Sequence, residues 1–238
     1  MAGNLYLIPV TLGGDDFDNV IPEKVLSLTR GLRYFIVEDT RNARRYLRKI
    51  DKRFPIDNTL FLELNEHTPE ADIINFLEPA LHGHDMGLMS EAGLPGVADP
   101  GSKIVALAHK MLLRVIPLSG PSSIILALIS SGFNGQNFTF NGYLPVKHAE
   151  KIARIRELEK NSGEGYAQIF METPYRAQKM LESIIEVCRD ETMLCIAADM
   201  TLSTEFIRSK KISDWKKNLP LLNDKLVIFI VQRPYFPV

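Results

Sequence analysis

The chain contains little cysteine and almost no net charge, and both features exclude classes of protein. Only two of its 238 residues are cysteines, Cys188 and Cys195, which lie in apolar surroundings. Their spacing fits neither a zinc site nor a disulfide framework, so it predicts two buried free thiols in a reducing compartment. The net charge of -1 and the pI near 6.5 exclude a globally basic nucleic-acid coat, although local basic patches remain compatible with them.

Long apolar runs and internal repeats are also missing from this sequence. The longest apolar runs, near residues 124–129 and 226–231, are far shorter than the roughly 20 residues that a membrane-spanning helix needs. The first residues do not combine a basic start, an apolar core and a small-residue cleavage site. We therefore expect a cytoplasmic protein without a membrane partner. Its length favours two α/β domains, at residues 1–117 and 118–238.

Apolar segments alternate with helical patterns along the first half. The predicted strands are residues 5–10, 34–37, 59–64, 85–89 and 114–118, and the predicted helices are 22–28, 42–50, 69–81 and a segment capped by Ser102. This alternation predicts a parallel-rich sheet. After a further helix at 124–129, the predicted strands are 138–144, 167–171, 193–198 and 226–231, with helices at 149–160 and 176–188. A polar stretch at 209–217 favours a mixed second sheet.

Residues 87–101 (GLMSEAGLPGVADPG) are the most informative segment, because they combine four glycines, two prolines and two acidic residues between a strand and a helix. Such a loop presents backbone N–H groups to a ligand without interference from side chains. A second loop, SGPSS at 119–123, follows the next strand, and Gly13 and Gly14 follow the first. In a parallel arrangement, both longer loops are expected to line one crevice at the carboxyl edge of the sheet.

Basic side chains are concentrated in one short segment. Between Arg41 and Arg53 lie seven basic residues against the single acidic residue Asp51. The segment is either a solvated helix face or a surface that follows the phosphates of a nucleic acid. Two further groups, Lys147, Lys151 and Arg154, and Arg208, Lys210 and Lys211, are candidates to extend it. A ligand with many carboxylates would favour arginine as well, so basicity alone does not identify the substrate.

The order of these motifs resembles the tetrapyrrole methylase superfamily, whose members use S-adenosylmethionine. The resemblance is greatest to the branch that methylates a cytidine ribose 2'-hydroxyl in bacterial small-subunit ribosomal RNA. The collinear segments are LYLIPVTLGG at the start, VEDTR at 37–41, NEH at 65–67, SEAGLPGVADPG at 90–101, SGPSS at 119–123, SGF at 131–133, GYLP at 142–145 and METPYR at 171–176. The resemblance implies a two-domain fold with the cofactor in a cleft between the domains, a homodimer, and ribosomal RNA or the small ribosomal subunit as partner.

Several residues acquire expected roles from this resemblance. Those expected to contact S-adenosylmethionine are Pro9, Ser90, Glu91, Ala92, Gly93, Pro95, Ser122, Ser123, Tyr143, Leu144 and Met171. Met171 has the alternative role of a core residue, because methionine readily fills gaps. The expected catalytic residues are Glu38 and Arg41 of VEDTR, and Glu172 and Arg176 of METPYR.

A base near the acceptor hydroxyl would assist methyl transfer, and Asp39, Glu66 and His67 are additional candidates because each follows a predicted strand. No second histidine at ligand spacing accompanies His67, so no metal site is expected. The chain departs from the RNA branch in its VTLGG turn, at Glu91 and Tyr175, and at the pair Asp224 and Lys225. Two alternatives therefore stay open: methylation of a tetrapyrrole ring carbon, and an inactive RNA-associated protein that binds the cofactor.

Overall fold

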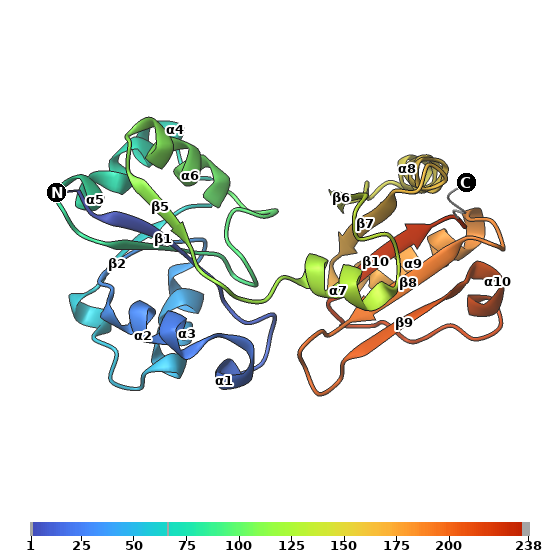
Figure 1. The fold of residues 1–238 in the computed structure, drawn as a ribbon, viewed down its shortest axis with the longest axis horizontal. Helices are drawn as coiled ribbons and strands as arrows, with labels where there is room; N and C mark the ends of the chain where they lie inside the picture. The colour runs from blue at the N-terminus through green and yellow to red at the C-terminus, as the bar shows by residue number, and fades with distance from the viewer. Residues whose placement is uncertain (1, 66, 235–238) are drawn as a thin grey trace. The chain divides into compact units, whose positions relative to one another are not determined.

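The structure is a computed structural model that describes residues 2–65 and 67–234. The chain divides into two compact units, which we call unit 1, ending at Ser122, and unit 2, beginning at Ser123. Each unit is built on one five-stranded sheet (Figure 1). Within the described residues, no helix is long and apolar enough to cross a bilayer.

The sheet of unit 1 is parallel throughout, as its apolar segments predicted. Its strands are β1 (Asn4–Ile8), β2 (Tyr34–Val37), β3 (Leu60–Glu63), β4 (Met86–Met89) and β5 (Arg114–Pro117), in the order β3-β2-β4-β1-β5. The central strand β4 is buried along its whole length. This burial explains why β4 is continuously apolar apart from its glycine, without the alternation of a half-exposed strand.

Helices cover both faces of this sheet. One face carries α1 (Phe17–Val20), α2 (Glu23–Gly31) and α3 (Thr40–Ile50), and the other carries α4 (Glu70–Ile73), α5 (Glu78–Leu81) and α6 (Gly101–Lys110) (Figure 1). A 3-10 turn, η1 (Ile56–Asn58), precedes β3. The chain proceeds outward from β1 to β3 and then returns toward β5. Because crossover connections are right-handed, this reversal places the later helices on the opposite face.

Two local predictions for unit 1 were wrong. The helix expected at 69–81 is divided into α4, the 3-10 helix η2 (Ile74–Leu77) and α5. Pro79 lacks the N–H group that would continue the helical hydrogen bonds from the preceding turn, and it lies in the first turn of α5, where that group is not needed. Ser102 does not cap α6, which already begins at Gly101. The N–H of Gly101 instead donates to the carboxylate of Asp99, at 2.7 Å.

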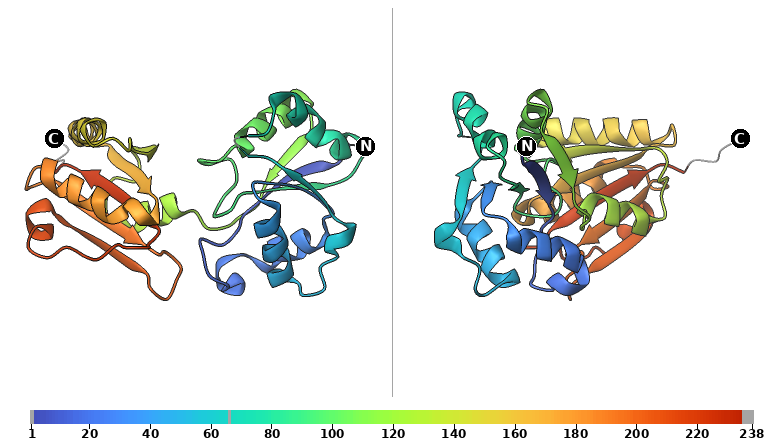
Figure 2. Two further views of the ribbon diagram at one scale, coloured as in Figure 1. Left: turned by 180° about the vertical axis from the view of Figure 1, so that it is seen from behind. Right: turned by 60° about the vertical axis from the view of Figure 1, so that its left-hand side comes forward.

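Unit 2 contains the mixed sheet that the sequence predicted. Its strands are β6 (Phe138–Tyr143), β7 (Ala167–Glu172), β8 (Met193–Ala198), β9 (Phe206–Lys211) and β10 (Val227–Gln232), in the order β6-β7-β10-β8-β9. Only β6 and β7 pair in parallel. The helices are α7 (Ser123–Ser131), α8 (His148–Ser162), the 3-10 helix η3 (Pro174–Arg176), α9 (Ala177–Val187) and α10 (Ile212–Trp215), and Figure 2 gives two further views of them.

The core of unit 2 lies between its sheet and the helices α8, α9 and α10. Phe170 of β7 and Phe229 of β10 stack with their ring centroids 5.6 Å apart. Trp215 is 1% exposed, and its indole N–H donates to the carbonyl of Leu194 at 3.0 Å. The aromatic side chains therefore hold α10 and the three central strands around one cluster.

The predicted polar stretch at 209–217 contains the end of strand β9 and the short helix α10, and the sequence analysis missed both elements. Among the described residues, strand β9 lies at the edge of the sheet and pairs with β8 alone. Arg208, Lys210 and Lys211 give it the charged character that discourages further strand pairing at an open edge. The sequence analysis identified strands by their apolar runs, and this edge strand has too few apolar residues to form one.

Candidate active site

The carboxyl edge of the unit 1 sheet brings together residues that the sequence analysis had singled out. Ile8 of β1 and Val37 of β2 both pair with Met89 of β4. The next residues, Pro9, Glu38 and Ser90, therefore lie at the same edge. The connection after β2 leads to α3 and that after β4 to α6, on opposite faces of the sheet (Figure 1). Such a divergence opens a crevice at the strand ends.

Backbone contacts join the three glycine turns at this edge. The N–H of Val10 donates to the carbonyl of Gly93 at 2.9 Å, and Gly93 has a φ of +72° that favours glycine. A Cβ at position 120 would lie only 2.1 Å from the Cβ of Pro9, so no larger residue fits there. A Cβ at position 93 would lie 3.5 Å from the carbonyl oxygen of Pro121. These contacts confirm that the loops at 87–101 and 119–123 lie together.

Asp99 fixes the conformation of the longer loop from inside. Its carboxylate accepts hydrogen bonds from the N–H of Gly96, at 2.8 and 2.9 Å, and from that of Gly101. Each bond to an ionised carboxylate is stronger than one between neutral groups. Glu91 and Ala92 are exposed at the start of the loop, whereas Gly93 and Pro95 are buried. Of the predicted cofactor residues in this loop, Glu91 and Ala92 are therefore accessible to a ligand, and the buried Gly93 and Pro95 support the shape of the loop.

A hollow of about 50 Å³ lies between the ends of β1, β2 and β4. It is lined by Val10, Thr11, Val37, Glu38, Asp39, Asn42, Ala43, Tyr46, Met89, Ser90 and Glu91. Glu38 Oε2 accepts a hydrogen bond from the N–H of Glu91 at 2.9 Å. The Asn42 amide donates to Glu91 Oε1 at 2.8 Å. This volume suits one small polar group, such as a hydroxyl.

Glu38 has an unusual ionisation equilibrium among the carboxylates of this edge. Burial raises the pKa of Glu38 above its ordinary value, and the hydrogen bond from the Glu91 N–H opposes this rise. The negative charges of Asp99 and Glu91 add to the rise. A buried carboxylate with a raised pKa is a stronger proton acceptor than an ordinary glutamate, a property typical of catalytic acids and bases.

The other base candidates of unit 1 have different surroundings. Asp39 caps α3, because its carboxylate accepts a hydrogen bond from the Asn42 N–H at 2.6 Å. His67 is exposed in the turn after β3, and Glu66 lies outside the described residues. Arg41 is exposed on α3 and forms no hydrogen bond or ion pair with the residues that the structure describes. Of these side chains, only Asp39 lines the hollow with Glu38.

The predicted residues of unit 2 also share one sheet edge. The parallel strands β6 and β7 end at Tyr143 and Glu172, and β8, which runs in the same direction, ends at Ala198. Tyr143 is half exposed, whereas the side chain of Leu144 is 3% exposed and belongs to the hydrophobic core. Leu144 can therefore offer a ligand only its backbone, and Tyr143 can offer its ring.

Glu172 and Arg176 form a buried ion pair at this edge. Glu172 Oε1 is 2.5 Å from a terminal nitrogen of Arg176 and accepts a second hydrogen bond from Arg176 Nε at 2.8 Å. The same oxygen accepts a bond from the Thr173 N–H at 2.8 Å. Because Oε1 of this carboxylate holds the guanidinium in place, the geometry favours positioning of Arg176 over proton transfer. The catalytic assignment of both residues stays a prediction.

The loop after β8 is a functional candidate that the sequence analysis missed. Asp199 and Thr201 have φ angles of +50° and +69°, a conformation that is costly for residues other than glycine. The hydroxyl of Thr201 is buried and has no hydrogen-bond partner among the described residues. A bound ligand would satisfy this group. The backbone conformation of Asp199 and Thr201 and the burial of the Thr201 hydroxyl identify this loop, and neither property can be read from the sequence.

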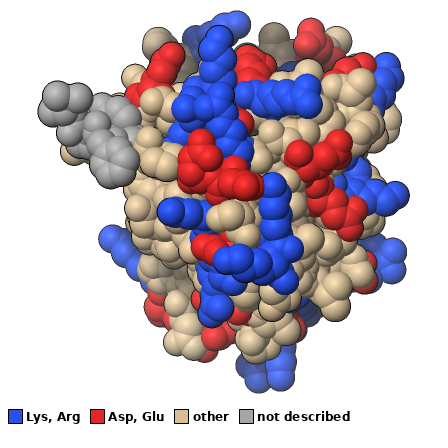
Figure 3. Space-filling model, turned by 90° about the vertical axis from the view of Figure 1, so that its right-hand side faces the viewer, with Lys and Arg blue, Asp and Glu red and all other residues tan. Residues whose placement is uncertain are grey.

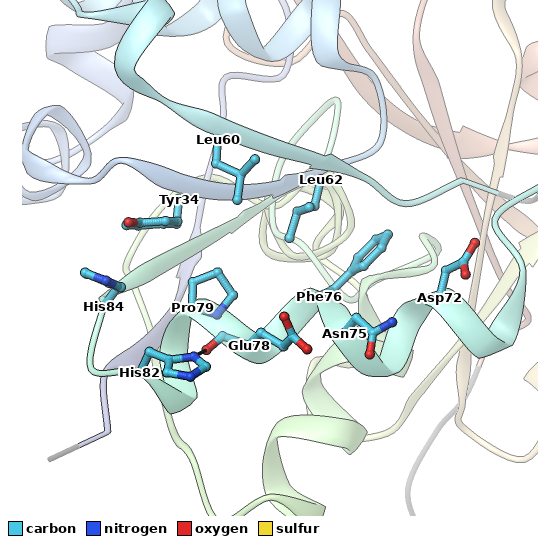
Figure 4. Close-up of a pocket in the computed structure, with 10 residues that line it drawn as sticks. All are labelled: Tyr34, Leu60, Leu62, Asp72, Asn75, Phe76, Glu78, Pro79, His82 and His84. Carbon is cyan, nitrogen blue, oxygen red and sulfur yellow. Dashed lines mark hydrogen bonds between the residues drawn. The ribbon is translucent and has the colours of Figure 1, made fainter.

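A larger hollow of about 620 Å³ lies elsewhere in unit 1, between β3 and the α4–α5 segment (Figure 4). Tyr34 and His84 stack at one end of it, with ring centroids 4.7 Å apart. None of the predicted site residues lines this hollow. Its volume therefore does not identify the active site. No group of three or more His, Cys, Asp or Glu residues that could hold a metal occurs in the described parts of the chain.

Known proteins resemble this chain over most of its length. It is 29% identical to ribosomal RNA small subunit methyltransferase I of Vibrio cholerae, over 88% of the chain and 69% of that protein. Its identity to the protein of the same name from Pseudomonas aeruginosa is 29%, over 90% of the chain and 73% of that protein. Its identity to the Haemophilus influenzae protein of this name is 28%, over 98% of the chain and 79% of that protein. No protein-family model matches the sequence.

A solved structure has the same fold. The methyltransferase CobJ superposes with a TM-score of 0.62 and 15% sequence identity, over 98% of this chain and 95% of that one. The sequence relatives identify the chain as a methyltransferase, and its fold is that of CobJ. Within that class, its similarity is to ribosomal RNA small subunit methyltransferase I. The resemblance stated from the sequence motifs is thereby confirmed.

Asp99 provides a first test of the site. We expect Asp99→Ala to lower the affinity for S-adenosylmethionine at least about tenfold, because the loop N–H groups of Gly96 and Gly101 lose their acceptor. Titration calorimetry measures this affinity. Ser102→Ala is the matched control, since Ser102 is an exposed residue of α6 in the same segment. Equal affinities for the two variants would contradict this role for Asp99.

Glu38 provides a test through pH. A raised pKa means that the folded protein binds this proton more tightly than the unfolded chain does, so ionised Glu38 lowers stability at neutral pH. This loss disappears as the pH falls below the ordinary value of 4.5. We expect Glu38→Gln to melt at a higher temperature than the wild type at neutral pH and at the same temperature near pH 4. Circular dichroism measures both, and a lower melting temperature at neutral pH would refute the assignment.

Proposed function

We propose that this protein transfers the methyl group of S-adenosylmethionine to the 2'-hydroxyl of a cytidine ribose in small-subunit ribosomal RNA. The observation that carries the proposal is the half-buried Glu38 in a hydroxyl-sized hollow where the glycine loops converge. The similarity to proteins named ribosomal RNA small subunit methyltransferase I supports RNA as the substrate.

S-adenosylmethionine supplies a methyl group that is already activated by its sulfonium, so the protein mainly has to position two reactants. In this proposal, Ser90, Ala92 and the backbone around Gly93 hold the cofactor from unit 1, with Ser122 and Ser123 nearby. In unit 2, Tyr143 and Met171 are the residues that we assign to the cofactor. The close approach of Gly120 to Pro9 and the buried, unpartnered hydroxyl of Thr201 are compatible with a ligand at these edges.

Glu38 is the residue that we assign to the acceptor. Its carboxylate accepts a hydrogen bond from the ribose 2'-hydroxyl, which orients an oxygen lone pair toward the methyl carbon. As the new C–O bond forms, the C–S bond breaks and S-adenosylhomocysteine leaves. The hydroxyl proton passes to Glu38, whose raised pKa favours its capture. Asn42 supports this arrangement, because it holds Glu91 beside Glu38.

Helix α3 supplies a surface for the RNA backbone. Ala43, Leu47 and Ile50 are its buried residues. Arg41, Arg45 and Arg48 are exposed on the opposite side at helical spacing, and Lys52 continues the row. We call these four residues the basic stripe. It begins three residues after Glu38, so a phosphate chain along it would pass next to the hollow.

Two of the remaining basic side chains of the segment have other contacts. Lys49 forms an ion pair with Asp15, and the Arg44 guanidinium lies 5.3 Å from the centre of the Phe61 ring. Some of the basic residues that were candidate extensions in unit 2 are also engaged, since Arg154 pairs with Glu157 and Lys210 lies over Trp215. Figure 3 shows a face of unit 2 on which basic and acidic side chains are interspersed. The basic stripe is therefore the better candidate for the RNA contact.

A tetrapyrrole acceptor is the second candidate. The likeness to CobJ supports it only at the level of the fold, because the identity is 15%. The basic stripe would also suit a ligand with several carboxylates. The sequence relatives favour RNA over this alternative. A homodimer, a cytoplasmic location and the small ribosomal subunit as partner belong to the same proposal.

The reaction is tested directly by transfer of a labelled methyl group to small ribosomal subunits from a strain that lacks this gene. We expect 2'-O-methylcytidine in the RNA, detected by nucleoside mass spectrometry, and its loss in Glu38→Gln. Wild-type protein that leaves subunits and free RNA unlabelled, but labels a uroporphyrinogen-type acceptor, would replace this proposal with the tetrapyrrole alternative. Tight cofactor binding without turnover on any acceptor would indicate the inactive RNA-associated protein.

The basic stripe predicts a specific salt dependence of RNA binding. Arg45→Gln together with Lys52→Gln removes two phosphate contacts, so we expect the slope of log affinity against log salt to become shallower by about 1.4. Fluorescence anisotropy with a labelled single-stranded RNA measures the slope. The control is Lys24→Gln with Lys110→Gln, two exposed lysines on other helices. The same slope in both double variants would contradict the RNA contact and would indicate that the exposed face of α3 is only solvated.

A further inference from the structure

A second polar hollow lies in unit 2, at the amino ends of β6 and β7. Its volume is about 300 Å³, and it is lined by Thr139, Asn141, Arg154, Asn161, Glu164, Tyr166 and Gln168. Thr139 pairs with Gln168, and the register of these strands continues to Tyr143 and Met171. The hollow is therefore near the opposite end of β6 and β7 from the predicted cofactor residues.

One wall of this hollow is held rigidly by hydrogen bonds. Gln168 is 2% exposed, and its side-chain oxygen accepts a bond from the Asn141 amide at 3.3 Å. Asn141 in turn accepts a bond from the Arg154 guanidinium at 2.9 Å. Glu157 binds another nitrogen of the same guanidinium at 2.6 Å. Arg154 is thus fixed in place before any ligand arrives, which lowers the entropic cost of binding.

The other wall carries polar groups that face no protein partner. The side chains of Thr139, Asn161, Glu164 and Tyr166 form no hydrogen bond or ion pair with the residues that the structure describes. They include a hydroxyl donor, an amide and a carboxylate acceptor. Tyr166 is 43% exposed and adds an aromatic face. Fixed and unpaired groups of both hydrogen-bonding types therefore surround a space beside a flat ring.

These groups discriminate between classes of ligand. A lone phosphate would approach Arg154 but would be repelled by the carboxylate of Glu164. An apolar ligand would leave the amides and hydroxyls without partners. A nucleobase matches the set, because its edge carries both donors and acceptors and its face stacks on an aromatic ring.

We propose that this hollow binds an unstacked base of the RNA substrate, at a nucleotide other than the one that is methylated. The inference rests on the proposed function, since it assumes an RNA substrate. In this arrangement the base stacks on Tyr166, and its edge meets Asn161, Glu164 and Arg154. The hollow would thereby add sequence or shape selectivity to the general phosphate attraction of the basic stripe.

The test uses the full chain and a fluorescent single-stranded RNA that carries the sequence around the methylated nucleotide. We expect Tyr166→Ala to weaken RNA binding about tenfold and Tyr166→Phe to restore it, because phenylalanine keeps the stacking ring. The affinity for S-adenosylmethionine, measured by calorimetry, should not change in either variant. Phe138→Ala is the matched control, since Phe138 is a partly exposed aromatic residue that pairs with Ala167, next to Tyr166, and lies outside the hollow.

The outcomes separate this inference from the proposed function. Wild-type affinity in Tyr166→Ala, with RNA still bound and methylated, would overturn the base-binding hollow alone. An equal loss of affinity in Phe138→Ala would also overturn it, because the effect would then not be specific to the hollow. A wild-type protein that neither binds nor methylates RNA would overturn the proposed function and this inference together.

Discussion

The candidate site depends on the close approach of the chain at the end of β1 to two glycine loops. Gly120 lies against Pro9 with no room for a Cβ, and Gly93 adopts a left-handed backbone conformation while its carbonyl binds Val10. Side chains at these positions would separate the loops. Because the loops cannot separate without losing these contacts, their N–H groups and Glu38 are held at one sheet edge before any ligand binds.

Charge is distributed in a way that suits two parts of one substrate. Glu38, Glu91 and Asp99 lie close enough at the crevice for their charges to influence one another. The basic stripe lies on the solvent side of α3, opposite the residues that anchor this helix to the core. A nucleic acid could thus be held by its phosphates outside the crevice while one hydroxyl enters it. The single short connection between β2 and α3 links the two regions.

The success of the sequence predictions followed the burial of each element. The strands of unit 1 were predicted because each contains a short apolar run, which is continuous in the buried central strands β2 and β4. Strand β9 was missed because an edge strand needs few apolar residues, and the break at Pro79 was missed because apolar spacing continues through it. Ser102 was a plausible cap by residue type, but Asp99 already bonds the Gly101 N–H at the start of α6.

The candidate site was predicted in part, for a similar reason. Glycine loops and acidic residues that follow strands can be read from a sequence, whereas the burial, the partners and the pKa of each acid cannot. Asp39 became a helix cap, Glu172 a buried ion-pair partner of Arg176 and Glu38 a half-buried carboxylate with a raised pKa. These differences arise from neighbours that are distant along the chain, such as Glu91 beside Glu38. The unpaired hydroxyl of Thr201 and the polar hollow around Tyr166 depend on the same kind of contact.

The sequence by itself determined the α/β class, the parallel character of the first sheet, the glycine loops and the resemblance to S-adenosylmethionine-dependent methyltransferases. Those properties follow from the local order of apolar, glycine and polar residues, which is written in the chain. Only the tertiary structure decided which acid is buried, which arginines are unpaired and which loops touch. These properties depend on distances between segments that are far apart in sequence, and burial and charge act through those distances.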